Sequence, residues 1–268
     1  MATLSLLSSL QQSPYFDDYD ETKKFLRMLF QPGVSLQVRE LTQLQTILQN
    51  QISRLGDSFY KDGSIVTGGQ INLNTNVSYI RLASTETASI FANQKIQLSG
   101  ADTITFDVIT TVEAEGSDAP VLIGVYSGSD TITTTSATIH IAGSTGISAQ
   151  TADAGTITGD GSIASISAGI YYINGFFVTV DAQTIVLEKF ATTPSYKVGL
   201  TITESITNNT DDSSLLDNAS GSFNVNAPGA NRYKIALILG KKSLTTISEQ
   251  NFIELLRVVN GLPTKIVK

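Results

Sequence analysis

The stretch Ser35–Ser58, SLQVRELTQLQTILQNQISRLGDS, decides how the rest of the chain is interpreted. Its apolar residues recur at steps of three and four, which predicts one long amphipathic helix. Pro32-Gly33 comes before it, Ser35 can cap its first turn, and Gly56 offers a left-handed exit at its end. The apolar positions of this helix are Val34, Val38, Leu41, Leu44, Leu48, Ile52 and Leu55.

The polar side of this helix carries amides where a solvated helix usually carries charges, so we expect it to meet other protein. Two interpretations are open: a central helix packed under a β layer, or a short coiled coil that joins identical subunits over about three heptads. The amides are Gln37, Gln43, Gln45, Gln49 and Gln51. The second interpretation predicts an interface formed by Val38, Leu41, Leu44, Leu48, Ile52 and Leu55.

Composition narrows the class of protein. The 268 residues suffice for one large domain or two modest ones, and 41% of them are hydrophobic. The net charge of −7 argues against a nucleic-acid-binding surface, and no apolar run of about 18 residues could insert into a membrane. Cysteine is absent, which excludes disulfides and thiolate metal sites. Few charges with many Ser, Thr, Asn and Gly residues are typical of β structure with polar outer faces.

A second helix is expected before the long one. Asp18 and Glu21 have capping-box spacing, Phe25, Met28 and Leu29 supply an apolar face, and Pro32-Gly33 ends the segment. The two helices would form a pair with a short connection. We therefore expect residues 1–62 to be a helical docking or oligomerisation module.

Past residue 62 the apolar period changes from 3.6 to 2, which indicates strands. Ile71–Tyr79 alternates cleanly, and Asn174-Gly175 between two apolar runs predicts a β-hairpin. Residues 63–80 with 163–268 are predicted to form an antiparallel sandwich-like or barrel-like domain. Residues 81–162, rich in Ser, Thr and Gly, are predicted to be an inserted β subdomain.

The chain is predicted to end in a helix over Glu249–Asn260. Ser248 would cap it, and Gly261 with Pro263 would stop it. Its apolar face would be Phe252, Leu255, Leu256 and Val259. The expected fold class is α+β, mainly β.

Candidate residues for chemistry are few. The one histidine, His140, stands between two isoleucines on a predicted strand, and neither a nucleophile elbow nor a phosphate-binding glycine loop is present. The loop carboxylates lack the spacing of a calcium loop; they are Asp153, Asp160, Asp211 and Asp212. We therefore expect no catalysis, no cofactor and no metal.

Several stretches resemble a family of tailed-bacteriophage virion proteins of the cyanophage type, which contain a domain of unknown function. The most specific are Tyr15–Asp20 (YFDDYD) and Arg39–Asn50 (RELTQLQTILQN), within Pro14–Gln51. Shorter matches follow at Gly169–Val178, Ser214–Asp217, Ala227–Ala230 and Asn251–Leu256. Residues 81–162 share no such motif.

The resemblance implies a structural, non-catalytic subunit of the virion tail, at the baseplate or at the attachment point of a fibre. It implies other tail proteins as partners and a homo-oligomer, first of all a trimer, because phage fibres are commonly threefold. Two alternatives are a subunit of a bacterial contractile injection particle and a carbohydrate-binding or depolymerising tail module. In the latter, the sugar platform would be Tyr171, Tyr172, Phe176 and Phe177.

Overall fold

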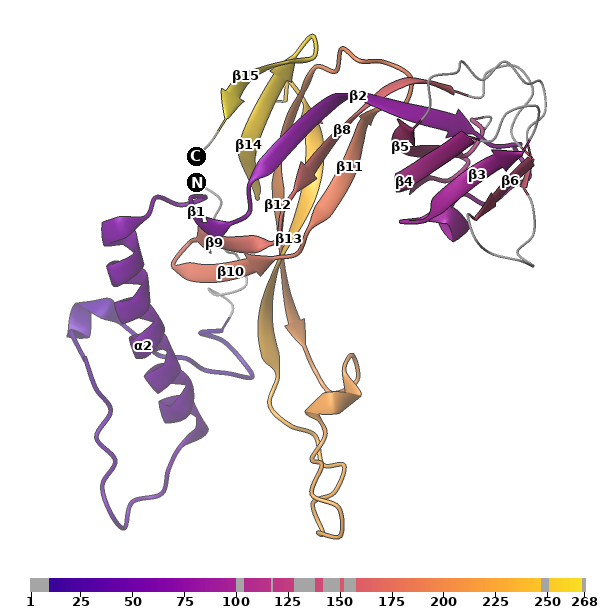
Figure 1. Ribbon diagram of the computed structural model, residues 1–268. Coiled ribbons are helices and arrows are strands. Elements are labelled where there is room, and N and C mark those ends of the chain that lie inside the picture. The colour runs from indigo at the N-terminus through magenta and orange to yellow at the C-terminus, as the bar shows by residue number, and fades with distance from the viewer. Residues whose placement is uncertain are drawn as a thin grey trace.

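The computed structural model describes residues 10–99, 104–116, 118–127, 138–141, 150–151, 158–246 and 251–266 (Figure 1). Within these ranges the chain forms one α-helix and three antiparallel sheets, so the mainly β prediction is confirmed. None of the helical structure described there is long and apolar enough to cross a membrane.

The elements follow one another from helix to sheets. The N-terminal part holds a 3₁₀ turn, η1 (Glu21–Lys23), and the helix α2 (Val38–Phe59). The strands, with two further 3₁₀ turns, are β1 (Ile65–Gly68), β2 (Ile71–Arg81), η2 (Ser89–Phe91), β3 (Lys95–Ser99), β4 (Ile104–Val112), β5 (Val121–Ser127), β6 (Thr138–Ile141), β7 (Gln150–Thr151), β8 (Thr158–Ile166), β9 (Gly169–Ile173), β10 (Phe176–Val180), β11 (Gln183–Glu188), β12 (Tyr196–Thr207), η3 (Ser213–Leu215), β13 (Arg232–Ser243), β14 (Phe252–Val259) and β15 (Leu262–Ile266).

The long predicted helix exists, with shifted ends. Gln37 is its N-cap, and the Gln37 backbone N–H donates to Glu40 Oε2 at 3.0 Å. Gly56 lies inside the helix and does not end it, so the predicted left-handed exit is wrong. The helix continues to Phe59, and Tyr60 N–H closes the last turn on the Gly56 carbonyl at 2.8 Å.

The predicted first helix is wrong, so there is no helix pair. Only the 3₁₀ turn η1 forms: Asp20 caps it by accepting from Thr22 N–H at 2.9 Å, and Lys24 ends it with a φ of 57°. The residues that were expected to form an apolar helix face, such as Phe25 and Leu29, are exposed. A helix this short depends on packing one face against the protein, and that packing is missing here.

The predicted C-terminal helix is also wrong, because Phe252–Val259 is the strand β14. It lies between β12 and β15 and pairs antiparallel with both. Asn260 and Gly261, both at positive φ (50° and 79°), form the turn into β15. The predicted cap, Ser248, and the predicted first residue, Glu249, lie outside the described residues.

Strand β2 links the two parts of the eight-stranded sheet, whose order is β11-β8-β2-β5-β4-β3-β6-β7. Its length from Ile71 to Ile80 pairs with β8, while Ser78–Arg81 pairs with β5. Figure 1 shows the resulting shape: β2 runs from the body of the molecule into a lobe that holds β3 to β6. The division into a β domain and an inserted subdomain stays a prediction, since one sheet passes through both.

Two main cores stabilise these parts. The larger fills the space between the four-stranded sheet (β13-β12-β14-β15), the small sheet (β1-β9-β10) and strands β8 and β11. The lobe has its own core around Phe91, Phe106 and Leu122. Gln183 joins two sheets through its side-chain amide, which donates to the Leu237 carbonyl at 2.9 Å and accepts from Leu239 N–H at 2.8 Å.

Strands β12 and β13 form a long arm. They pair without interruption over twelve residues each, from Tyr196 opposite Ser243 to Thr207 opposite Arg232. Figure 1 shows this arm leaving the body on the same side as the N-terminal end of α2, with residues 208–231 at its tip.

Candidate functional site

Helix α2 is attached to the body by the β9–β10 hairpin. The Tyr172 hydroxyl lies 2.7 Å from Asp57 Oδ1 and 2.8 Å from the Ser53 carbonyl. Gln49 donates its side-chain N–H to the Gly175 carbonyl at 2.7 Å. Because the Tyr172 ring lies directly on Gly56, a Cβ at Gly56 would come within 2.3 Å of it. Glycine is therefore needed here for close approach of the hairpin.

The N-terminal segment, residues 10–24, covers a second side of the helix. The buried Asp17 carboxylate accepts a hydrogen bond from Thr46 Oγ1. Arg39 pairs with Asp18 at 3.1 Å, and Arg54 pairs with Glu21. We call the residues of α2 that contact the hairpin or this segment the inner face; they are Arg39, Gln43, Thr46, Ile47, Gln49, Ser53, Arg54, Gly56 and Asp57.

The opposite side of the helix is apolar and open. Its large hydrophobic side chains are exposed by 43% at Leu41 to 77% at Val38. Together with Gln45, which is also exposed, they form a stripe along the whole helix. We call this stripe the outer face; its residues are Val38, Leu41, Gln45, Leu48, Ile52, Leu55 and Phe59.

The six residues predicted from sequence as an interface all lie on α2. Five belong to the outer face, and Leu44 is half-buried at its margin. The sequence prediction missed Gln45 and Phe59. A seven-residue count from Val38 reaches both, but the prediction followed apolar residues only and ended the helix at Gly56.

Two other regions of the chain expose large apolar side chains. The segment from Lys24 to Gln37 has no regular structure and exposes six large side chains. At the tip of the arm, Phe223 is fully exposed. The tip is nevertheless ordered by its own backbone, since Asp217 N–H donates to the Ala227 carbonyl and Asn226 N–H to the Asp217 carbonyl, both at 2.9 Å. The six residues of the segment are Phe25, Leu26, Leu29, Phe30, Val34 and Leu36.

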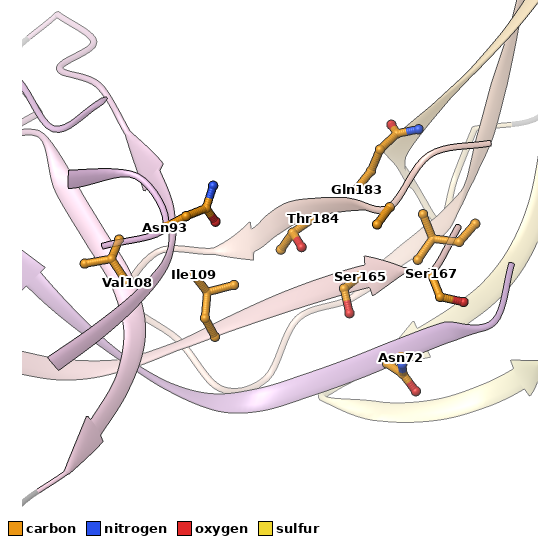
Figure 2. Close-up of a pocket in the computed structure, with 10 residues that line it drawn as sticks. Asn72, Asn93, Val108, Ile109, Ser165, Ser167, Gln183 and Thr184 are labelled. Atoms are coloured by element: carbon orange, nitrogen blue, oxygen red, sulfur yellow. The ribbon is translucent and has the colours of Figure 1, made fainter. Parts of the chain in front are cut away.

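A shallow cavity of about 570 Å³ lies in the bend of the eight-stranded sheet, where strands β2, β8 and β11 face the lobe (Figure 2). None of its lining residues is titratable, so they cannot act as acid, base or charged ligand. The amide of one of them, Gln183, is already bonded to β13. The lining residues are Asn72, Asn93, Val108, Ile109, Ser165, Ile166, Ser167, Ala182, Gln183 and Thr184.

The residues considered for chemistry do not gather into a site. His140 is on β6, opposite Gln97 on β3. Asp212 caps η3 by accepting from Ser214 N–H at 2.9 Å, and the hydrogen bonds with Ser214 lower its pKa. Asp211 accepts from Asn208 N–H at 3.2 Å. Asp153 lies outside the described residues. Within the ranges that the structure covers, no three His, Cys, Asp or Glu side chains are grouped as they would be around a metal ion.

The aromatic residues considered as a sugar platform are mostly internal. Tyr171 and Tyr172 are completely buried, and Phe176 is half-buried. Only Phe177 is exposed, and it packs against Tyr60 and Tyr172 with ring centroids 5.9 Å and 5.3 Å apart. Tyr172 fixes the hairpin to α2, while Tyr171 donates to the Gly69 carbonyl and Phe176 packs against Tyr233, so the four rings do not form one exposed surface.

Comparison with known protein families identifies the family of this chain. A family model described as a domain of unknown function, DUF4815, matches residues 13–156 and 144–264, which together span most of the chain. No curated protein and no solved structure matches. The chain therefore belongs to the DUF4815 family.

Proposed function

We propose that this protein is a structural, non-catalytic component of a bacteriophage tail, located at the baseplate or at the attachment point of a fibre. It assembles through protein–protein contacts, first of all as a homo-oligomer, and the resemblance to phage proteins favours a trimer. The observation that carries this proposal is the open apolar outer face of α2.

The outer face is unfavourable for a protein that works alone. Fully burying one large apolar side chain stabilises a protein by roughly 1.5–3 kcal/mol relative to leaving it exposed, and each of these half-exposed side chains forgoes a part of that. Six such side chains stand in one stripe along 22 residues of helix. Contiguous exposed patches of this kind mark interaction surfaces.

The two motifs that most resemble phage virion proteins contact each other. Asp17 and Asp18 belong to the first motif, and Arg39 and Thr46 belong to the second. The carboxylates bond Thr46 and Arg39, so these stretches hold α2 in place with its outer face open. This contact supports an assembly role for the N-terminal part of the chain.

The arm gives the molecule a second contact point. Its tip exposes Phe223 on an ordered loop. In this proposal, α2 joins the copies, the sheets act as a rigid spacer, and the arm reaches the next tail component.

The first test is the solution mass of the purified chain by light scattering. We expect an oligomer for the parent and a folded monomer for the triple variant Leu41→Ser, Leu44→Ser, Leu48→Ser. The matched control changes three exposed apolar residues elsewhere to serine and should stay oligomeric; these are Val125, Ile238 and Leu262. A parent that is monomeric at all concentrations would contradict self-assembly through α2.

The tail location needs a separate test. Antibodies against the purified chain, imaged by electron microscopy on intact particles from the source, should label a phage tail near its end. Label on the capsid, on a contractile injection particle, or on no particle would contradict the proposed location.

A further inference from the structure

We infer that the neighbour on the outer face of α2 is a second copy of this chain, parallel and in register, and that Gln45 sets the register. This inference rests on the proposed assembly role. It adds the direction of the partner helix, the register of the pairing and the residue that specifies both.

The outer face has the spacing of a coiled-coil seam. Counting by sevens from Val38 gives Gln45, Ile52 and Phe59 as a positions, and counting from Leu41 gives Leu48 and Leu55 as d positions. The seam thus spans three complete heptads without a break. All seven positions are exposed in the single chain.

The four charged side chains of the helix lie outside the seam, and each of them bonds to another group of the same chain. Arg39 pairs with Asp18, and Arg54 pairs with Glu21. Glu40 accepts the cap N–H of Gln37, and Asp57 bonds the Tyr172 hydroxyl. The outer face is therefore uncharged. Two copies of it can meet without repulsion, which makes it complementary to itself.

Gln45 is the only polar residue of the seam. Gln43 and Gln49 donate to the Asp18 and Gly175 carbonyls on the inner face, whereas Gln45 is exposed and lies within the outer stripe. Once the seam is covered, an amide without a partner is unfavourable, because it has lost its hydrogen bonds to water. The residue that best satisfies a glutamine amide in this layer is another glutamine, which can both donate and accept.

Of the alignments that use the whole length of the seam, only one brings the two glutamines together. A parallel, in-register pair places Gln45 opposite Gln45. A parallel pair shifted by one heptad places it opposite Val38 or Ile52. An antiparallel pair with full overlap, in which Val38 meets Phe59, places it opposite Ile52. Each wrong alignment buries the amide against an aliphatic side chain, so the polar layer selects the parallel register.

The parallel arrangement also agrees with the layout of the chain. Figure 1 shows the β body joined to the C-terminal end of α2, through β1. Parallel packing gathers the bodies at one end of the helical bundle and points the arms in one direction. A tail part that presents equivalent contacts to one neighbour needs this geometry.

The native chain has no cysteine, so disulfide cross-linking of single-cysteine variants tests the inference directly. We expect Leu41→Cys alone and Leu55→Cys alone each to form interchain disulfides, because identical positions face each other. Gln51→Cys, on the same helix beside the seam, is the control and should cross-link about tenfold less, since its copies lie on opposite flanks of the bundle.

Mixing differently tagged chains shows whether the two helices pack parallel or antiparallel. In a parallel pair, a mixture of Leu41→Cys and Leu55→Cys chains should give disulfides between like positions only. An antiparallel pair brings these two positions together, and unlike disulfides would then dominate and overturn the inference.

The variant Gln45→Leu tests whether the glutamine amide sets the register of the pairing. We expect association to tighten by about tenfold, because a buried polar layer is removed. Register should loosen, so that mixed Leu41→Cys and Leu48→Cys chains cross-link in the Gln45→Leu background and not in the parent. An unchanged register would overturn the assignment of Gln45. These outcomes are separate from the particle labelling, which alone decides the tail location.

Discussion

The two faces of α2 differ in how their side chains are satisfied. The inner face is polar, and its charges and amides bond to the hairpin or to the N-terminal segment. The outer face is apolar apart from Gln45, and its side chains are open. The inner face therefore stabilises the single chain, while the outer face is available for association. Substitutions on the two faces should separate the two properties.

Two adjacent residues give the sharpest contrast. Ile47 is 2% exposed on the inner face, and Leu48 is 56% exposed on the outer face. Ile47→Ala should lower the free energy of unfolding by about 2–4 kcal/mol, because it leaves a cavity. Leu48→Ala should change the stability of the single chain by less than about 0.5 kcal/mol. It should weaken association by about tenfold or more.

Urea unfolding over a range of protein concentrations measures both effects, since only association makes stability depend on concentration. If Ile47→Ala removed the concentration dependence while Leu48→Ala kept it, the assignment of the faces would be reversed.

Substitution of Gly56 should disrupt the contact between the inner face and the hairpin, with a smaller loss of stability than Ile47→Ala. A Cβ at this position meets Cε2 of Tyr172 at 2.3 Å and the hydroxyl oxygen at 2.8 Å, so the hairpin has to shift. We expect Gly56→Ala to lower the free energy of unfolding by about 1–3 kcal/mol, although alanine favours helix elsewhere. Gly240→Ala is the control for loss of glycine, because a Cβ there would have Thr201 Oγ1 as its nearest neighbour at 3.4 Å and the backbone is not at positive φ. Equal effects at both positions would mean that the contact with Tyr172 is unimportant.

High pH should weaken the contact between Tyr172 and the inner face. Burial raises the pKa of the Tyr172 phenol, and the hydrogen bond to Asp57 raises it further. A folded pKa above the ordinary value of 10.0 means that this contribution is complete below about pH 10 and is lost as pH rises through the folded pKa. Urea unfolding below and above pH 10 should therefore show a steeper loss for the parent than for Tyr172→Phe. Identical slopes would show that the phenol–carboxylate contact does not contribute.

The ion pairs should have the smallest effect. The side chains in both pairs, Arg39–Asp18 and Arg54–Glu21, are about half exposed. Arg39→Gln or Arg54→Gln should cost no more than about 1 kcal/mol of stability and leave association unchanged. The loss should shrink at high salt. A change in oligomeric mass in either variant would show that the charges also act across the outer face.

The sequence predicted the elements in which local signals and final environment agree. The long helix was found because its apolar period persists over six turns, and the β9–β10 hairpin was found because Asn174-Gly175 stands between apolar runs. In the structure Ile173 faces Phe176 across that turn, and both turn residues have positive φ. These two predictions depend on few long-range contacts.

The second Asn-Gly turn was missed. Asn260-Gly261 joins β14 to β15 in the same way, with Val259 opposite Leu262. The apolar residues of β14 are compatible with one side of a helix as well as with a strand buried between neighbours. Gly261 and Pro263 then served as helix stop signals. Pairing with β12, whose partner residues lie about 55 positions earlier, makes this segment a strand and not a helix. No local sequence pattern encodes that pairing.

The candidate site was predicted in part. The apolar residues of α2 were named from their period alone, but the inner face was not. Its contacts with Tyr172 and Gly175 join residues more than 100 positions apart. That α2 forms an interface stays a prediction until its mass and cross-links are measured.

The β12–β13 arm is also a mechanical element. A pull on the tip along the arm loads both strands in the same direction, so the backbone hydrogen bonds that resist it in shear are those between β12 and β14 at the base of the arm. A second tether runs from Asn231, near the tip, whose amide donates to the Tyr15 hydroxyl at 2.6 Å. Tyr15 belongs to the segment that is bonded to α2. A force applied at the tip thus has a second route to the helix, through the Asn231–Tyr15 hydrogen bond, which bypasses the sheets.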